Sequence, residues 1–206
     1  MAADSSPHNP RSGHPLLRAF DHARLWVASE VGICEAARLL ACAAEAGFGP
    51  IGEVIGIAEG GRTPAALIAA HLDVPLRIVH ARHNPTEALY TQATGEVACD
   101  IGSIAAGSMR GRVLLVDDIC GTGATLCTVA DALATADLRL ISCVLCLNAG
   151  AHMIPDLWVW EVRDWVVFPW EAVPDTPLLR VDLPMPTEVH VRMSVDFQAN
   201  GVRETQ

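Results

Sequence analysis

Positive charge is scarce in this sequence of 206 residues: Lys and Arg total 14 against 24 Asp and Glu, and the net charge is −10. No stretch of the chain concentrates the few basic side chains, so the sequence argues against a nucleic-acid-binding face. No apolar run reaches membrane-spanning length, and the N-terminus lacks the basic-then-apolar layout of a signal peptide. We therefore expect neither a membrane span nor secretion.

The seven cysteines are an odd number and lie mostly inside apolar segments. This pattern is typical of buried thiols in a reducing compartment, and it predicts a cytoplasmic protein. Cys143 and Cys146 have CxxC spacing, but they fall within an apolar run and no second pair accompanies them, so core packing is the better interpretation. The eight histidines form no H-E-x-x-H or comparable cluster, and no structural zinc site is predicted.

The chain is organised around residues 112–126, where an apolar run is followed by two acids, a Gly/Thr turn and a helical pattern. The β-branched run at 113–116 predicts a strand buried on both faces, as in a parallel sheet. After the turn, apolar residues recur at helical spacing and predict a helix packed against that sheet: Leu126, Val129, Ala130 and Leu133.

The turn itself has the chemistry of a phosphate site. Its glycines allow a tight turn, after which successive N–H groups at the start of the helix face an anion. Thr122 and Thr125 add hydroxyl donors, whereas Asp117 and Asp118 suit ribose hydroxyls or a magnesium ion. The stretch therefore predicts a ligand that is both sugar and phosphate, the alternative being an ordinary turn with solvated acids.

Strands and helices alternate along the rest of the chain. Residues 15–46 predict one long helix, or two that are broken near Gly32, and Thr63 is expected to cap a helix that runs to Leu72. Further buried strands are predicted at 53–58, 77–82 and 138–147. The alternation predicts an α/β fold with a doubly wound, mostly parallel sheet, whose ligands bind at the carboxyl ends of the strands.

Residues 116–125, Val-Asp-Asp-Ile-Cys-Gly-Thr-Gly-Ala-Thr, resemble the phosphoribosyl-pyrophosphate signature of type I phosphoribosyltransferases. In that family the acids hold the ribose 2′- and 3′-hydroxyls, and the loop holds the 5′-phosphate. The resemblance implies catalytic acids at Asp117 and Asp118, which also hold Mg²⁺, directly or through water. It implies a ribose 5-phosphate site formed by these acids with Cys120, Gly121, Thr122, Gly123, Ala124 and Thr125. Two rival motifs, the P-loop and the dinucleotide fingerprint, are absent.

A second glycine turn resembles the loop that grips pyrophosphate in the purine enzymes of this family. The resemblance implies a pyrophosphate site at Glu59, Gly60, Gly61, Arg62 and Arg82. Paired glycines are also used by ordinary strand-to-helix turns. Residues 83–111 carry little periodicity, and family members have a mobile flap at this place that closes over the reacting centre. Tyr90 and Thr91 are candidates to reach the site from this segment, alongside the alternative that they are solvated.

Residues 157–171 hold four of the five tryptophans. On any interpretation they form an aromatic cap, and residues 165–171 also resemble the hood of bacterial and archaeal 6-oxopurine phosphoribosyltransferases. In that hood an aromatic residue stacks on the base, and the backbone of the next residue binds its edge. The resemblance implies base binding by Trp165 and by the backbone of Val166, and Asn148 can hydrogen-bond a ring edge.

The sequence departs from the 6-oxopurine pattern at two positions. Many of those enzymes have an aspartate where this chain has Gly121, and its carboxylate lies near purine N7. They also have a lysine that binds the 6-oxo group, whereas the corresponding place here is Leu147, Asn148 and Ala149. Relatives that use adenine, orotate or uracil have a small residue at the first position. The acceptor base is therefore left open.

The expected function is transfer of ribose 5-phosphate from phosphoribosyl pyrophosphate to a nitrogen of a planar, purine-like base, with Mg²⁺. Two alternatives are a non-catalytic regulator that senses a nucleotide or phosphoribosyl pyrophosphate, and a specialised biosynthetic or hydrolytic relative with an unusual acceptor. We expect one domain at 15–184 with its hood at about 150–175, a loose segment at 1–14, and a tail or arm at 185–206. A homodimer or higher homo-oligomer is expected.

Overall fold

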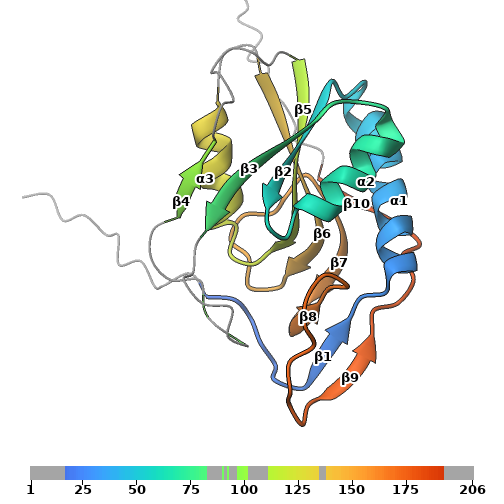
Figure 1. The fold of residues 1–206 in the computed structure, drawn as a ribbon, viewed down its shortest axis with the longest axis vertical. Coiled ribbons are helices and arrows are strands. Elements are labelled where there is room, and N and C mark those ends of the chain that lie inside the picture. Colours follow the sequence, from blue (N-terminus) through green and yellow to red (C-terminus); the bar gives the residue numbers. More distant parts are fainter. Residues whose placement is uncertain are drawn as a thin grey trace, which may run out of the picture.

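The structure is a computed structural model that describes residues 17–82, 90, 92, 97–101, 111–134 and 138–192. Figure 1 shows a central sheet with helices on both sides and a smaller sheet below it. In chain order the elements are β1 (Arg24–Val27), α1 (Glu30–Phe48), β2 (Glu53–Ala58), α2 (Arg62–Leu72), β3 (Leu76–Arg82), β4 (Ala98–Asp100), β5 (Gly111–Cys120), α3 (Ala124–Leu133), β6 (Leu138–Asn148), β7 (Leu157–Val162), β8 (Trp165–Val167), β9 (Leu179–Asp182) and β10 (His190–Val191).

The main sheet has seven strands in the order β10-β7-β6-β5-β2-β3-β4. Its five inner strands are all parallel, and only the two edge strands, β4 and β10, pair antiparallel with their neighbours. β5 lies between β2 and β6, with Val116 opposite Gly56 on one side and Cys143 on the other. The predicted doubly wound, mostly parallel α/β sheet is therefore confirmed.

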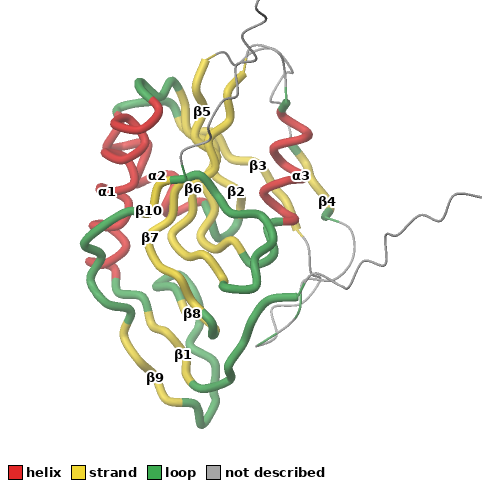
Figure 2. Tube along the Cα trace, turned by 180° about the vertical axis from the view of Figure 1, so that it is seen from behind, coloured by secondary structure: helices red, strands yellow, loops and turns green. Residues whose placement is uncertain are grey.

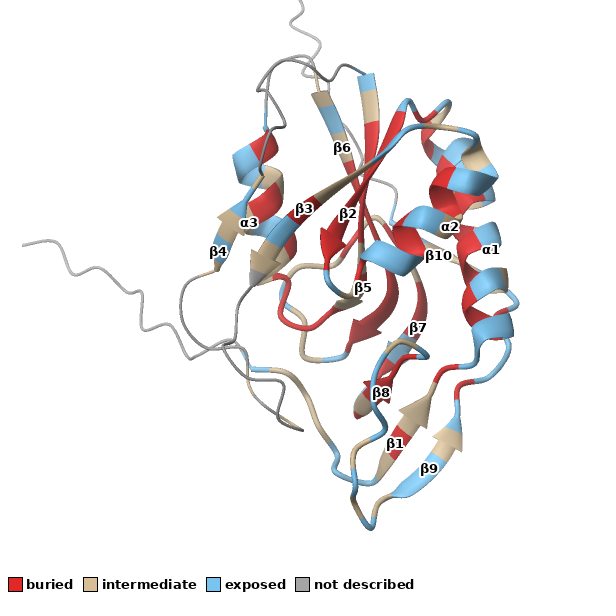
Figure 3. Ribbon diagram, viewed as in Figure 1, coloured by how far each residue is buried: buried red, intermediate tan, exposed pale blue. Residues whose placement is uncertain are grey.

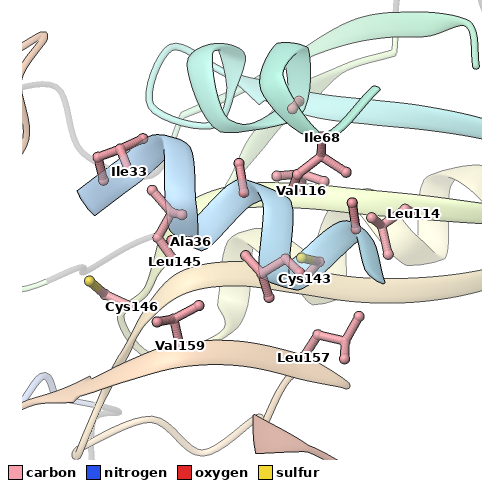
Figure 4. Close-up of a cluster of buried hydrophobic side chains, with 14 of the residues drawn as sticks. Ile33, Ala36, Ile68, Leu114, Val116, Cys143, Leu145, Cys146, Leu157 and Val159 are labelled. Carbon is pink, nitrogen blue, oxygen red and sulfur yellow. The ribbon is translucent and has the colours of Figure 1, made fainter. Parts of the chain in front are cut away.

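The middle of β5 is buried because both faces of the sheet are covered. Leu114 and Val116 pack with α1 and α2 on one face, whereas Val113 and Leu115 pack with α3 on the other. This division follows from the alternation of side chains along a strand. Figure 3 shows the buried strands between the helices, and Figure 4 shows the core under α1 and α2, where Ile33 and Ile68 meet β5, β6 and β7.

The prediction of helix over residues 15–46 is wrong at its N-terminal end. β1 occupies Arg24–Val27, and α1 begins only at Glu30, after Ser29, whose side chain accepts a hydrogen bond from the Gly32 N–H at 3.1 Å. Gly32 is buried inside α1 and does not break it. Local pattern failed here because β1 is stabilised by pairing with two strands that are distant in sequence.

These three strands form a second, small sheet in the order β8-β1-β9, with both pairs parallel. Figure 2 shows it beyond the ends of the main strands. It contains the predicted hood residues, Trp165 and Val166. The hood thus draws on three separate segments of the chain, of which one lies near the N-terminus.

Three smaller outcomes concern segment ends. The N-cap of α2 is Gly61 and not Thr63, because the Gly61 carbonyl already accepts from the Ala65 N–H at 3.0 Å. In the segment expected as a tail or arm, β10 pairs with β7 in the main sheet. The expectation of a loose segment at 1–14 lies outside the described residues. No described helix combines the length and apolarity needed to cross a membrane.

Candidate functional site

The two acids lie near the carboxyl end of β5. Asp118 is buried and Asp117 is half-buried, and the Asp118 N–H donates to Asp117 Oδ1 at 3.0 Å. Burial raises the pKa of Asp118 to about 6. Burial and the neighbouring Asp118 carboxylate raise the pKa of Asp117 well above its usual value. Such a pair gains from a nearby cation or from hydroxyl groups that donate to it.

The turn after β5 is buried, and it leads directly into α3. Gly123 has φ +96°, and a Cβ at this position would lie 2.4 Å from Met153 Cβ, so both conformation and packing require glycine. The Thr122 carbonyl accepts from the His152 N–H at 3.1 Å, and Thr122 Oγ1 accepts from the Ala124 N–H at 3.3 Å. His152 and Met153 thus support the turn from behind.

A recess of about 110 Å³ opens between the acids and this turn. Its walls are Arg18, Asp117, Asp118, Ile119, Cys120, Gly121, Thr122, Gly123, Thr125 and Leu126. The structure therefore brings together the two acids and most of the predicted ribose 5-phosphate residues. Cys120 serves packing: burial raises its thiol pKa to about 12, and its Sγ donates to the Met153 carbonyl at 3.3 Å.

The second glycine turn, residues 59–62 after β2, packs directly on the acid strand. A Cβ at Gly60 would lie 2.1 Å from Asp118 Oδ2, and one at Gly61 would lie 2.5 Å from the Val116 carbonyl oxygen. Glu59 and Arg62 are exposed, and their side chains pair at 3.4 Å. The predicted pyrophosphate turn is thus adjacent to Asp118. The side chain of Arg82, like Thr91, lies outside the described residues.

Asn148, at the end of β6, is engaged by the chain itself. Its Oδ1 accepts from the N–H groups of Ala19 at 2.8 Å and Gly150 at 2.9 Å, and its Nδ2 donates to the Ala19 carbonyl at 3.0 Å. The amide therefore holds the segment before β1 against the edge of the sheet. Base binding by Asn148 stays a prediction.

Trp165 lies in a cluster of aromatic rings at the hood. It is half-buried, with ring centroids 6.1 Å from Phe20 and 6.0 Å from Tyr90, and Tyr90 also meets His22 at 4.3 Å. The Val167 carbonyl accepts from the N–H of Ala28, the residue that follows β1, so the backbone groups of the preceding residue, Val166, point to the opposite edge of β8. In the described sheet that edge has no neighbouring strand.

Sequence reasoning missed Arg18. Its guanidinium lies against Gly121, where a Cβ would be 2.3 Å from Arg18 Nε and 2.9 Å from its Cζ. The residue lies near the start of the stretch predicted as helix, residues 15–46, and no local pattern marks it as functional. The one available signal was the small residue at position 121, which leaves space for a side chain from elsewhere in the chain.

Among the described residues, no cluster of three or more His, Cys, Asp or Glu side chains could hold a metal ion. Asp117 and Asp118 nevertheless offer the hard oxygen ligands that Mg²⁺ prefers. Magnesium commonly uses one or two carboxylates and completes its shell with substrate oxygens and water. The donor set fits such a shared ion.

Comparison with known proteins places these features in one family. The phosphoribosyl transferase domain model matches residues 35–176. The fold resembles a purine phosphoribosyltransferase from Pyrococcus horikoshii, with 24% identity, a TM-score of 0.60, and coverage of 74% of this chain and 97% of that one. It also resembles the Helicobacter pylori xanthine-guanine-hypoxanthine phosphoribosyltransferase (19%, 0.59, 72% and 93%) and a hypothetical Neisseria gonorrhoeae protein with bound ppGpp (21%, 0.59, 73% and 91%).

Proposed function

The chain belongs to the phosphoribosyl transferase domain family, and from this premise we propose that it transfers ribose 5-phosphate from phosphoribosyl pyrophosphate to a ring nitrogen of a purine-like base. In this reaction the bond between C1′ and the pyrophosphate oxygen breaks, and the oxygen keeps the electron pair. A lone pair of the base nitrogen forms the new bond to C1′, and the base loses its N–H proton. The products are a nucleoside 5′-monophosphate and pyrophosphate.

The observation that carries this proposal is the meeting of two glycine turns with two acids, the buried Asp118 and the half-buried Asp117. Asp117 and Asp118 accept hydrogen bonds from the ribose hydroxyls, while the turn that ends at Gly123 and the first N–H groups of α3 receive the 5′-phosphate. Gly60 lies against the carboxylate of Asp118, so the pyrophosphate leaves next to the same acid. One sugar-phosphate ligand then contacts both turns.

We also propose that a magnesium ion binds at the two acids. Asp117 and Asp118, which both line the recess, are the residues that would hold Mg²⁺, directly or through water. When bound, the ion supplies positive charge that offsets the departing pyrophosphate. The carboxylates orient the ribose, and the turns exclude water from the sugar carbon.

Trp165 supports a planar acceptor, because an aromatic face stacks on any flat heterocycle. The open edge of β8 at Val166 supplies backbone donors and acceptors for the edge of that ring. Since both residues belong to the small sheet, acceptor and sugar-phosphate are held by different parts of the molecule. The Pyrococcus and Helicobacter proteins, named as purine enzymes, suggest purines as the first bases to test.

The test is incubation with phosphoribosyl pyrophosphate, Mg²⁺ and a panel of purines and pyrimidines, with pyrophosphate and nucleotide followed by mass spectrometry. We expect base-dependent release of both products, and loss of both in the double variant Asp117→Asn/Asp118→Asn. Asp131→Asn, an exposed acid on α3, is the matched control and should keep wild-type turnover. Tight ligand binding with no product in wild-type protein would contradict catalysis and favour the sensing alternative.

A further inference from the structure

The segment from Arg18 to His22 connects the two halves of the proposed site. At one end Arg18 lines the recess beside the acids. At the other end, Phe20 lies 6.1 Å from Trp165, and Phe20 and His22 both contact the Tyr90 ring, at 5.0 and 4.3 Å. An acceptor that stacks on Trp165 and reacts above the acids would therefore lie along this segment.

The segment is held in place by hydrogen bonds from the side chains of Gln92 and Asn148. The Arg18 N–H donates to Gln92 Oε1 at 2.7 Å, and the Arg18 carbonyl accepts from Gln92 Nε2 at 3.1 Å. Asn148 makes the same pair of contacts with the next residue, Ala19. Gly150 allows the close approach, because a Cβ there would lie 2.6 Å from the Ala19 nitrogen.

The position of the guanidinium depends on the residue at 121. Arg18 fills the volume that any side chain at Gly121 would need, since Arg18 Nε lies 2.3 Å from the Cβ position. Gly121 is buried, and its φ is not in the left-handed region, so conformation alone does not require glycine. Residue 121 is glycine because the Arg18 side chain occupies the space that a larger residue would need.

The surrounding residues that the structure describes leave part of the Arg18 guanidinium without a hydrogen-bond partner. Among the described residues, Arg18 Nε is buried without a hydrogen-bond partner, and Arg18 forms no ion pair with Asp117 or Asp118 within the 4.0 Å that defines one. Burial lowers the Arg18 pKa, and the two acids raise it. A buried donor that lacks a partner is costly, so Arg18 lowers stability where it lies, and its place in the wall of the recess is better explained by a role toward a ligand there.

We propose that Arg18 reads the edge of the acceptor base and that it selects a purine with a 6-oxo group; this rests on the function proposed above. The guanidinium has donors only, so it recognises hydrogen-bond acceptors. A 6-oxopurine presents two adjacent acceptors, N7 and O6, that match the arginine fork, whereas adenine presents N7 beside an amino donor. The sequence contains no lysine, so Arg18 is the cationic side chain that lines the recess.

The decisive variant is Arg18→Met, which keeps the length of the side chain and removes its donors. With phosphoribosyl pyrophosphate saturating, kcat/KM for hypoxanthine and guanine should fall about 5- to 160-fold, the discrimination given by a bidentate pair. The value for adenine should stay the same or rise, and the KM for phosphoribosyl pyrophosphate should not move. Arg38→Met, at an exposed residue of α1, is the control and should behave as wild type.

A second variant tests the link to residue 121. Gly121→Ala places a Cβ on the guanidinium and should shift the base preference in the same direction as Arg18→Met. The double variant should add no further shift, because both changes remove one contact. A purely structural role for Arg18 predicts additive losses that are equal for all bases, with a lower thermal midpoint.

The outcomes separate this inference from the function on which it rests. Wild-type protein that forms nucleotide from none of the bases would contradict the proposed function. Turnover with an unchanged base preference in Arg18→Met would overturn the role of Arg18 alone. A rise in the KM for phosphoribosyl pyrophosphate, equal for all bases, would show that Arg18 binds the phosphate. A fall in this KM would show that the Arg18 side chain obstructs the sugar-phosphate site. Either result overturns the inference.

Discussion

Two strand-to-helix turns meet at the carboxyl edge of the main sheet, and they differ in what makes their glycines necessary. In the turn after β5, Gly123 is required by its own conformation and by Met153, whereas Gly121 is required by Arg18. In the turn after β2, Gly60 is required by the Asp118 carboxylate. The first turn is buried, while the second carries exposed charged residues at both ends.

The difference shows that a glycine in a strand-to-helix turn can be required for separate reasons. Where packing behind the turn requires the glycine, the glycine is needed for the stability of the fold. Where the turn lies against the Asp118 carboxylate, the glycine is needed for the spacing of the proposed site, and so for function. Substitutions in the two turns should therefore divide into those that unfold the protein and those that disable it while it stays folded.

The largest effect is expected where the two turns meet, at the acids. Asp117→Asn with Asp118→Asn should weaken phosphoribosyl pyrophosphate binding by about 3–6 kcal/mol, since hydrogen bonds to a charged group contribute about 1.5–3 kcal/mol each. The fold should survive, because the change removes buried charge and keeps the shape. Calorimetry in the presence of Mg²⁺ measures the affinity. Unchanged affinity in the folded double variant would remove the central assignment.

The next effect separates packing from conformation in the buried turn. Gly123→Ala should lower the free energy of unfolding by about 2–5 kcal/mol, the sum of about 1–2 kcal/mol for the left-handed conformation and about 1–3 kcal/mol for overpacking against Met153. Gly111→Ala is a matched control, because Gly111 has φ +82° and nothing within 4 Å of the Cβ position. It should cost only the conformational part. Equal losses in urea unfolding would exclude a role for Met153.

The acids should also leave a signature in the pH dependence of stability. The pKa of Asp118 is about 6 in the folded protein against an ordinary 3.8, so the folded state binds this proton more tightly than the unfolded state. The stabilisation is therefore complete below about pH 4 and is lost as pH rises through 6, on the order of 2–3 kcal/mol. Urea unfolding at pH 4, 5, 6 and 7 should show this fall relative to the double Asn variant. Parallel profiles would mean that Asp118 is not buried in its acidic form.

The β5 turn could be predicted from sequence because its signal is local. A buried run, two acids and a glycine turn occur within fifteen consecutive residues, and the structure keeps them in one unit from β5 to α3. Strands β2, β3 and β6 were predicted within one residue of each observed end for the same reason. Periodicity and turn chemistry act over the same short range as these contacts.

The hood and Arg18 could not be predicted from sequence because their signals are not local. β1 pairs with strands that lie about 140 and 155 residues further along the chain, so no window of sequence contains its partners. Arg18 reaches Gly121 through hydrogen bonds from Asn148 and Gln92 to the backbone. Only a folded chain brings these residues together.

A smaller effect is expected for Trp165, which lies away from both turns. Trp165→Ala should weaken base or nucleotide binding by about 1–3 kcal/mol, the contribution of one base-aromatic stack. Affinity for phosphoribosyl pyrophosphate should hardly change, because that ligand presents no ring, and Trp165→Phe should recover much of the loss. Titration of tryptophan fluorescence with nucleotide and with phosphoribosyl pyrophosphate compares the two ligands. Equal losses for both would indicate collapse of the packing with Phe20 and Tyr90.

The smallest effect on stability is expected in the exposed turn. Arg62→Met should change the free energy of unfolding by no more than about 0.5 kcal/mol, because Arg62 and Glu59 form a solvated pair at 3.4 Å with exposed fractions of 49% and 71%. Pyrophosphate affinity should nevertheless fall, since the variant removes a cation from the loop beside Asp118. Arg38→Met breaks a comparable exposed pair on α1 and should leave that affinity unchanged. If both variants bind pyrophosphate as the wild type does, the exposed turn contributes only its backbone, and the two turns differ less than their side chains suggest.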